Sequence, residues 1–150
     1  MTTLKRTNSD DKDFIELVKY LDAELAIIDG EDHSFYDQYN KIDNIKHVIV
    51  AYKDNKPAAC GAIKELNPTT MEVKRMYTVA KGRGHGLATQ ILVQLEQWAL
   101  ELGYQKCVLE TGKRQEDAVA LYQKNGYQLT NNYGQYVGIE NSVCFEKEMK

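Results

Sequence analysis

The sequence predicts an α/β fold, with a mixed, mostly antiparallel central sheet and helices on both faces. Three observations support this fold class. Several short segments have strand-like apolar and β-branched runs, and longer segments repeat apolar residues at helical spacing. One passage has the order strand, turn, helix, strand, which predicts that its two strands lie parallel. The 150 residues suit a single domain over 1–150, which is long enough to bury its own core.

The chain is expected to begin with a short strand over Leu4–Thr7 and a first helix. Apolar residues recur at helical spacing from Phe14 to Ile28 and give the helix one apolar face. Asn8, Ser9 and Asp10 offer N-caps, and a glycine after the last apolar residue ends the helix.

A hairpin and a third strand are expected next. Val48–Tyr52 and Pro57–Lys64 flank a polar turn and are predicted to pair as a hairpin. Asn67-Pro68 marks another turn, and Met71–Val79 is the strand that follows it.

The C-terminal half predicts two helices and three strands. The main helix covers Leu87–Gly103, and the strand Lys106–Glu110 after it should lie parallel to a neighbour. A last helix over Gln115–Asn125 precedes two closing strands, Tyr127–Thr130 and Val143–Glu148.

Composition narrows the class of protein. The formal net charge of −3 disfavours nonspecific nucleic-acid binding, although it is compatible with cationic amine substrates. No apolar run reaches the length of a membrane span, and no signal-peptide pattern opens the chain, so we expect a cytoplasmic protein without a membrane partner. Cys60, Cys107 and Cys144 are widely spaced and indicate buried core residues, with neither a disulfide nor a metal site.

The most informative stretch is Arg83–Ala88, a glycine-rich turn between a predicted strand and the main helix. Unpaired N–H groups at a helix start, together with the helix dipole, favour a phosphate. A P-loop would need Lys and Ser or Thr where Leu87-Ala88 stands, and a dinucleotide site would need a differently placed third glycine. The turn therefore predicts a different kind of phosphate site.

Arg83, Gly86 and Ala88 match the Arg/Gln-x-x-Gly-x-Gly/Ala loop of the GNAT family of N-acetyltransferases. Residues 118–127 resemble that family's Ala-x-x-Leu-Tyr-x-Lys-x-Gly-Phe/Tyr segment, and residues 142–147 resemble the closing strand of a bacterial, small single-domain branch. Matching order and spacing cover residues 45–150. The chain thus resembles this family through several spaced motifs.

The resemblance implies a transferase that uses acetyl-CoA as co-substrate and no metal. It would move the acetyl group to a primary amine of a small molecule or a protein, by direct attack through a tetrahedral intermediate. It also implies a set of cofactor-binding residues: Met76, Tyr77, Thr78, Arg83, Gly84, His85, Gly86, Leu87, Ala88, Thr89, Gln115 and Tyr122.

Two positions depart from the family pattern. Many members carry Asn where this chain has Gln115, at a contact with the pantetheine arm of coenzyme A. A branch with Thr-Gly-x-x-Gln resembles residues 111–115, so a longer amide can keep that contact. Ala80 stands where a proline usually precedes the loop.

Two catalytic residues are implied. Tyr122 matches the general acid that protonates the departing thiolate, and the alternative is an ordinary core tyrosine. Glu72 matches a general base, and its place four residues before Met76 predicts that both point to one strand face. The alternative for Glu72 is a solvent-facing carboxylate or one paired with a neighbouring Lys or Arg, and Glu110 is a weaker candidate base.

Two segments are expected to wall the acceptor site. Residues 31–39 and 131–140 carry Phe35, Tyr36, Tyr39, Tyr133 and Tyr136, and aromatic walls suit cations or apolar groups. Residues 31–46 are predicted to hold loops and a short helix.

Other functions stay open at this level. A non-catalytic acyl-CoA-binding sensor or partner domain is the main alternative, and a nucleotide-binding regulatory domain is a weaker one. The exposed closing strands could also pair two copies into a homodimer.

Overall fold

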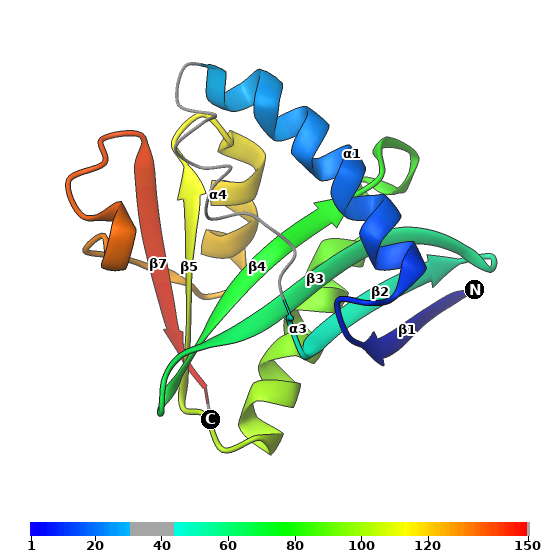
Figure 1. Cartoon of the computed structure of the whole chain (residues 1–150), viewed down its shortest axis with the longest axis horizontal. Helices are drawn as coiled ribbons and strands as arrows, with labels where there is room; N and C mark the ends of the chain where they lie inside the picture. Colours follow the sequence, from blue (N-terminus) through cyan, green and yellow to red (C-terminus); the bar gives the residue numbers. More distant parts are fainter. Residues whose placement is uncertain (31–43, 150) are drawn as a thin grey trace.

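The computed structural model describes residues 1–30 and 44–149, in which one sheet carries helices on both faces (Figure 1). Its strands follow the order β1-β2-β3-β4-β5-β7-β6. The strands are β1 (Thr2–Thr7), β2 (His47–Lys53), β3 (Lys56–Asn67), β4 (Thr70–Thr78), β5 (Lys106–Gly112), β6 (Gln128–Thr130) and β7 (Ser142–Glu148). The helices are α1 (Lys12–Asp29), α3 (Leu87–Glu101) and α4 (Glu116–Lys124), with short 3₁₀ turns η2 (Ala80–Gly82) and η3 (Gly134–Tyr136).

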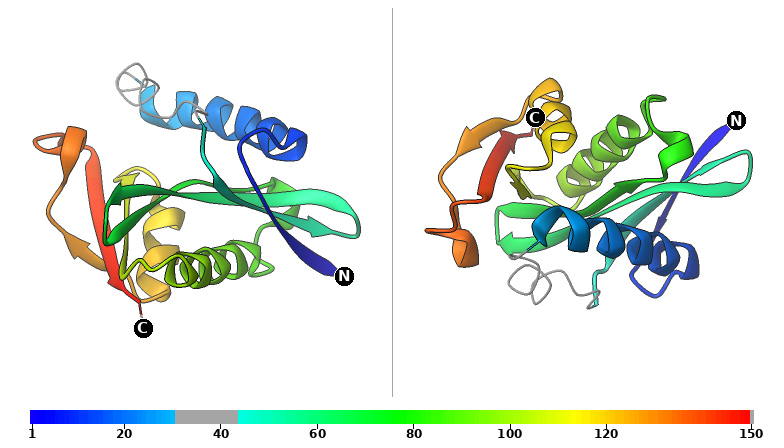
Figure 2. Two further views of the ribbon diagram at one scale, coloured as in Figure 1. Left: turned by 60° about the horizontal axis from the view of Figure 1, so that its bottom comes forward. Right: turned by 90° about the horizontal axis from the view of Figure 1, so that it is seen from above.

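The sheet is mixed and mostly antiparallel, as predicted. Among the strands of residues 1–30 and 44–149, only β4 and β5 pair in parallel, which confirms the crossover expected through the main helix. Figure 2 shows α1 on one side of the sheet and α3 and α4 on the other. The expected helix and loops over residues 31–46 lie mostly outside the described residues.

The start of α1 differs from the prediction. The N-cap is Asp11, whose Oδ1 accepts from the N–H groups of Asp13 at 2.9 Å and Phe14 at 3.1 Å. Ser9, one of the predicted caps, instead accepts from the Ile45 N–H through Oγ at 3.0 Å. That tertiary contact uses the hydroxyl that local sequence would assign to the helix.

Two apolar layers cover the sheet. On one face, Ile91, Leu92 and Leu95 of α3 are fully buried against the strands. On the other, Phe14 and Val18 of α1 pack with β2 and β3. The three cysteines are buried and free, as predicted.

A β-bulge in β4 corrects one expectation. Cys60 pairs with Tyr77 but Ala62 pairs with Lys74, so β4 carries an extra residue there. Arg75 in the bulge takes a left-handed φ of 58°.

The bulge shifts the alternation of side chains along β4. Met76 packs with the layer under α3, close against Gly61, whereas Tyr77 packs with the layer under α1. Met71 and Val73, which flank Glu72, also belong to the α3 layer. Glu72 and Met76 therefore point to opposite faces, and the prediction that they share one face is wrong.

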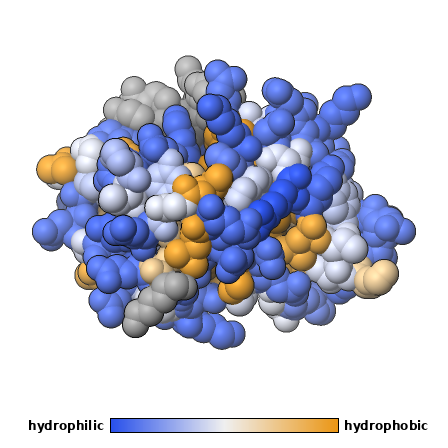
Figure 3. Space-filling view, turned by 90° about the horizontal axis from the view of Figure 1, so that it is seen from below, coloured by the Kyte–Doolittle hydropathy of each residue, from blue (hydrophilic) through white to orange (hydrophobic). Residues whose placement is uncertain are grey.

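The surface carries no large apolar band on the face drawn in Figure 3, where hydrophobic side chains stand in small groups among hydrophilic ones. Within the described part of the chain, no helix is both long and apolar enough to cross a bilayer.

Candidate functional site

The site begins where β4 and β5 separate. The two strands pair at three positions, the last being Glu72 opposite Val108. Beyond that point β4 continues to Thr78 alongside β3, and β5 continues to Gly112 alongside β7. The middle of the sheet therefore opens toward the C-terminal ends of β4 and β5.

A groove of about 690 Å³ lies at this opening, between α1, the end of β4, the glycine-rich turn and α4. That volume lies within the range of roughly 300–1,000 Å³ typical of small-molecule and cofactor sites. The predicted cofactor residues that line it are Met76, Tyr77, Thr78, Arg83, Gly84, Gly86, Leu87, Ala88, Thr89, Gln115 and Tyr122. His85 of the same set is exposed and does not line the groove.

The backbone of the glycine-rich turn is left-handed at two of its glycines. Gly84 and Gly86 have φ of 83° and 77°, which side-chain-bearing residues adopt only with strain. A Cβ on either would meet no atom within 4 Å, so conformation rather than packing selects glycine here. Gly86 is also the N-cap of α3, whose first N–H groups have no acceptor within the helix.

Arg83 connects this turn to α1. Its Nε donates to the Thr78 carbonyl at 2.9 Å, and its guanidinium pairs with Glu24 at 2.9 and 3.1 Å. The two side chains form an ion pair on the rim of the groove, and both are half-exposed.

A second, smaller cavity of about 100 Å³ continues from the groove, and the two share Met76, Gln115 and Tyr122. Glu72 and Tyr122, the two predicted catalytic residues, both line it. The fold therefore brings residues from β4 and α4, fifty positions apart in the sequence, around one small chamber.

Tyr122 is buried between the two cavities. Its ring packs edge-on against Tyr127 with centroids 5.8 Å apart. Burial, followed by the nearby Glu110 carboxylate, raises the pKa of Tyr122, so its phenol is protonated at neutral pH. Among residues 1–30 and 44–149, no hydrogen bond is made by this hydroxyl. The site therefore holds a protonated phenol without a fixed partner.

Glu72 is 8% exposed, and its carboxylate has a polar contact to each of two described residues. The Tyr133 hydroxyl donates to Oε2 at 2.7 Å, and Lys74 Nζ lies 3.9 Å from Oε1. Burial lowers the pKa of Lys74, and the Glu72 carboxylate opposes that effect. The alternative that Glu72 pairs with a neighbouring lysine is thus realised loosely, at the outer limit of an ion pair.

Sequence reasoning missed Arg75. Its side chain is 2% exposed, lines the small cavity and forms an ion pair with Asp22 of α1. The Cys60 thiol also donates to its carbonyl at 3.4 Å. The available signal was a third charged residue, after Glu72 and Lys74, in one strand, but the sequence does not show the bulge that accommodates it.

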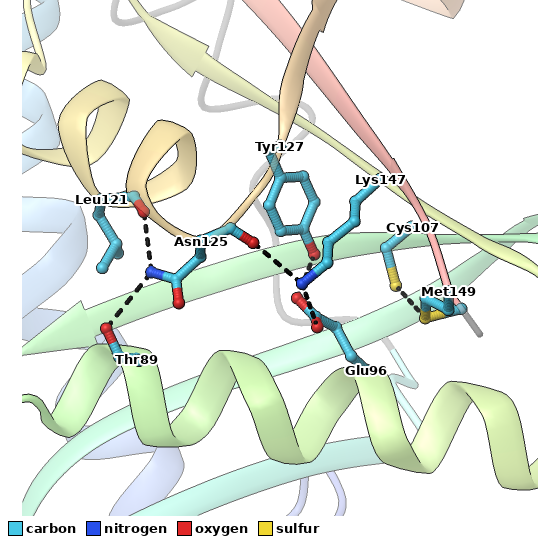
Figure 4. Close-up of polar contacts among 8 residues, drawn as sticks. All are labelled: Thr89, Glu96, Cys107, Leu121, Asn125, Tyr127, Lys147 and Met149. Atoms are coloured by element: carbon cyan, nitrogen blue, oxygen red, sulfur yellow. Dashed lines mark hydrogen bonds and ion pairs between the residues drawn. The ribbon is translucent and has the colours of Figure 1, made fainter.

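A polar network connects the C-terminal end of α4 with α3 and β7 (Figure 4). Asn125 Nδ2 donates to Thr89 Oγ1 at 3.3 Å and to the Leu121 carbonyl at 2.8 Å. Lys147 Nζ reaches the Asn125 carbonyl and Glu96 Oε1, each at 2.9 Å. The network ties the end of α4 to the first turn of α3, and so fixes Tyr122 relative to the glycine-rich turn.

Comparison with known proteins agrees with this architecture. A model of the acetyltransferase (GNAT) family matches residues 14–127. The uncharacterized N-acetyltransferase YsnE of Bacillus subtilis is 35% identical over 101 residues, which cover 66% of this chain and 67% of YsnE. The IAA acetyltransferase of Azospirillum brasilense is 28% identical over 137 residues, 90% of each chain.

Solved structures show the same fold. A Klebsiella pneumoniae protein, provisionally described as an acyl-CoA N-acyltransferase, superposes with a TM-score of 0.84 at 27% identity, covering 100% of this chain and 99% of that one. The PaiA N-acetyltransferase of Thermoplasma acidophilum, solved with coenzyme A, gives 0.73 at 14% identity and covers 99% of both chains.

The fold and the matched family define an acyl-CoA-dependent acetyltransferase. The chain belongs to the GNAT family of acetyltransferases, as its motifs predicted.

Proposed function

We propose that this protein transfers the acetyl group of acetyl-CoA directly to a primary amine, with the reaction in the chamber between Glu72 and Tyr122. One observation carries the proposal. The groove that starts at the glycine-rich turn leads, through the opening between β4 and β5, into the small cavity that both residues line.

The residues along the groove fit a coenzyme A ligand. The pyrophosphate would lie over the turn, where the backbone of Gly84 and Gly86 is open and the first N–H groups of α3 are unpaired. The pantetheine arm would run between the diverging strands. Arg75 and Met76 have no register partner on β3, and they lie beyond the last β4–β5 pair at Glu72. Gln115 lines both cavities and can supply the amide contact.

The chemistry needs three groups. An ammonium has no lone pair, so Glu72 or a water beside it takes a proton and leaves the amine neutral. The amine nitrogen attacks the thioester carbonyl carbon, and a backbone N–H near Met76 stabilises the resulting oxyanion, a contribution on the order of 3 kcal/mol. The carbon–sulfur bond then breaks, and the thiolate takes the Tyr122 proton. The surplus proton on the amide nitrogen passes through water to the Tyr122 phenolate, which restores the acid.

The acceptor, a small molecule or a protein amine, would enter through the small cavity. Tyr136 lines this cavity and Tyr133 contacts Glu72, so an aromatic wall stands beside the carboxylate. Aromatic faces and a carboxylate together attract a cationic amine. Phe35, Tyr36 and Tyr39, the other predicted wall residues, lie outside the described part of the chain.

The first test is thermal unfolding with acetyl-CoA, coenzyme A, ATP or NAD. A ligand at a hundredfold excess over its Kd stabilises the native state by about 2.7 kcal/mol. We expect a selective upward shift in Tm with the two coenzyme A ligands. Equal shifts with ATP or NAD, or no shift at millimolar acetyl-CoA, would contradict the proposal.

The second test is release of the coenzyme A thiol in the presence of simple primary amines such as tyramine, putrescine and lysine. Turnover that depends on the amine and yields an N-acetyl product supports transfer. Tight binding of acetyl-CoA without any product, across these amines and a lysine-containing peptide, would favour the acyl-CoA-binding sensor instead. The sensor is the second candidate function because this chain has Gln115 at the position where many members of the family have Asn.

A further inference from the structure

Tyr133 comes from a segment remote in sequence from β4, yet its hydroxyl lies 2.7 Å from Glu72 Oε2. The Glu72 side chain is buried, with 8% exposed, and Tyr133 is part-buried. A hydrogen bond from a neutral donor to an ionised acceptor is roughly twice as strong as one between neutral groups. This contact is therefore a substantial restraint on the carboxylate that the proposed function uses as base.

The segment that carries Tyr133 is built to hold this position. Asn132 Nδ2 lies 3.0–3.2 Å from the carbonyl oxygens of Tyr136, Ile139 and Ser142. One side-chain amide therefore holds three parts of the loop together. The Tyr133 carbonyl accepts from the Tyr136 N–H at 2.9 Å, and the two rings meet edge-on at 5.7 Å. These contacts place Tyr133 independently of Glu72.

The two carboxylate oxygens of Glu72 have different surroundings. With Oε2 occupied by the phenol, Oε1 has Lys74 Nζ as a neighbour only at 3.9 Å. Oε1 is thus the oxygen with room to accept a proton.

Several other charged or titratable groups surround this carboxylate. They are Lys74 and the Arg75–Asp22 pair beside it, Lys64 opposite it on β3, Glu110 on β5, Tyr136 in the loop and Cys144 on β7.

We propose that Tyr133 is a positioning residue for acetyl transfer: its hydroxyl holds the Glu72 carboxylate in one orientation, with Oε1 turned toward the incoming amine. The inference rests on the proposed function, because it assigns Tyr133 a role through Glu72.

The contact can be tested without any acceptor, by ¹³C NMR of the Glu side-chain carboxyls at neutral pH, with Glu72 assigned from its loss in Glu72→Gln. In Tyr133→Phe the Glu72 carboxyl resonance should move, because Oε2 loses the donor that lies 2.7 Å away. The control is Tyr52→Phe, which removes a similar phenol–carboxylate bond to Asp13 and should leave the Glu72 resonance unchanged. An unchanged Glu72 resonance in Tyr133→Phe overturns the inference.

Activity then separates this inference from the proposed function. With tyramine as acceptor at saturating acetyl-CoA, Tyr133→Phe should lower kcat about tenfold with little change in KM for acetyl-CoA. In a Glu72→Gln background it should cost nothing more. An additive loss in both backgrounds would mean that Tyr133 acts only on the fold. If Glu72→Gln itself leaves transfer unchanged while Tyr133→Phe still moves the Glu72 resonance, the base assignment fails and the contact stands.

Discussion

At the scale of single residues, Tyr122 is defined by its surroundings more than by its motif. A tyrosine in an Ala-x-x-Leu-Tyr helix would often be a core residue whose hydroxyl is paired. Here the ring is packed like a core residue while the hydroxyl has no partner among the described residues, and the side chain lines both cavities. This combination suits a proton donor, since burial also raises the pKa of the phenol.

Tyr122→Phe should therefore keep the fold and the stabilisation by acetyl-CoA but lower kcat on the order of 100-fold, the usual contribution of a general acid. Steady-state kinetics and thermal unfolding on the same preparation measure both quantities. Tyr20→Phe removes an exposed phenol of α1 and should change neither. An unchanged kcat in Tyr122→Phe, with chemistry limiting turnover, would remove this residue from the mechanism.

At the scale of elements, the strand–turn–helix unit forms the end of the groove where we propose that the pyrophosphate binds. Its two left-handed glycines keep side chains off this part of the groove. A left-handed φ costs a residue with a Cβ roughly 1–2 kcal/mol, whether or not the position has a function. A substitution there must therefore be compared with a glycine of the same conformation elsewhere.

Gly86→Ala and Gly103→Ala make that comparison. Both glycines have positive φ, 77° and 94°, and at neither would a Cβ meet an atom within 4 Å. Both variants should lose about 1 kcal/mol of unfolding free energy, but only Gly86→Ala should also lose most of the Tm shift with acetyl-CoA. Equal ligand shifts in the two variants would show that the turn does not hold the cofactor.

The bulge of β4 is the second element that shapes the site. It requires Gly61 on β3, because a Cβ there would lie 2.4 Å from Met76 Sδ and 2.8 Å from Ile91 Cγ2. Gly61→Ala should lower the free energy of unfolding by about 1–3 kcal/mol through overpacking. Urea unfolding measures it. The loss should shrink in a Met76→Ala background, whereas strictly additive losses would show that Met76 is not the obstacle.

At the scale of the whole molecule, burial of cysteine links stability to alkaline pH. Burial raises the pKa of Cys60 and Cys107 to about 12, from 9.0 for an exposed thiol. The folded protein therefore retains these protons over a range in which the unfolded chain releases them. The resulting stabilisation is complete below about pH 9 and is lost as pH rises toward 12.

Urea unfolding at pH 7, 9 and 10.5 tests this linkage. The free energy of unfolding should fall above pH 9 by roughly 1.4 kcal/mol per buried thiol for each pH unit. Cys60→Ala should have a shallower dependence than the parent protein. Identical slopes in the two proteins would assign the alkaline loss to other groups, such as the buried tyrosines.

The sequence by itself determined the order of strands and helices, the parallel crossover, the glycine-rich turn and the family. These features depend on local periodicity, on positive φ at glycines and on motifs that are contiguous in the chain. Glu72, Tyr122 and most residues that line the groove could also be named from motifs, although the motifs do not show how these residues come together.

Tertiary structure decided the rest, because contacts between distant segments override local pattern. The cap of α1 moved to Asp11 when Ser9 bonded to Ile45. The bulge at Arg75 turned Met76 away from the face of Glu72, since one extra residue inverts every later side chain of a strand. The Tyr133 hydroxyl reached Glu72 from sixty-one residues away, a pairing that no spacing in the sequence encodes.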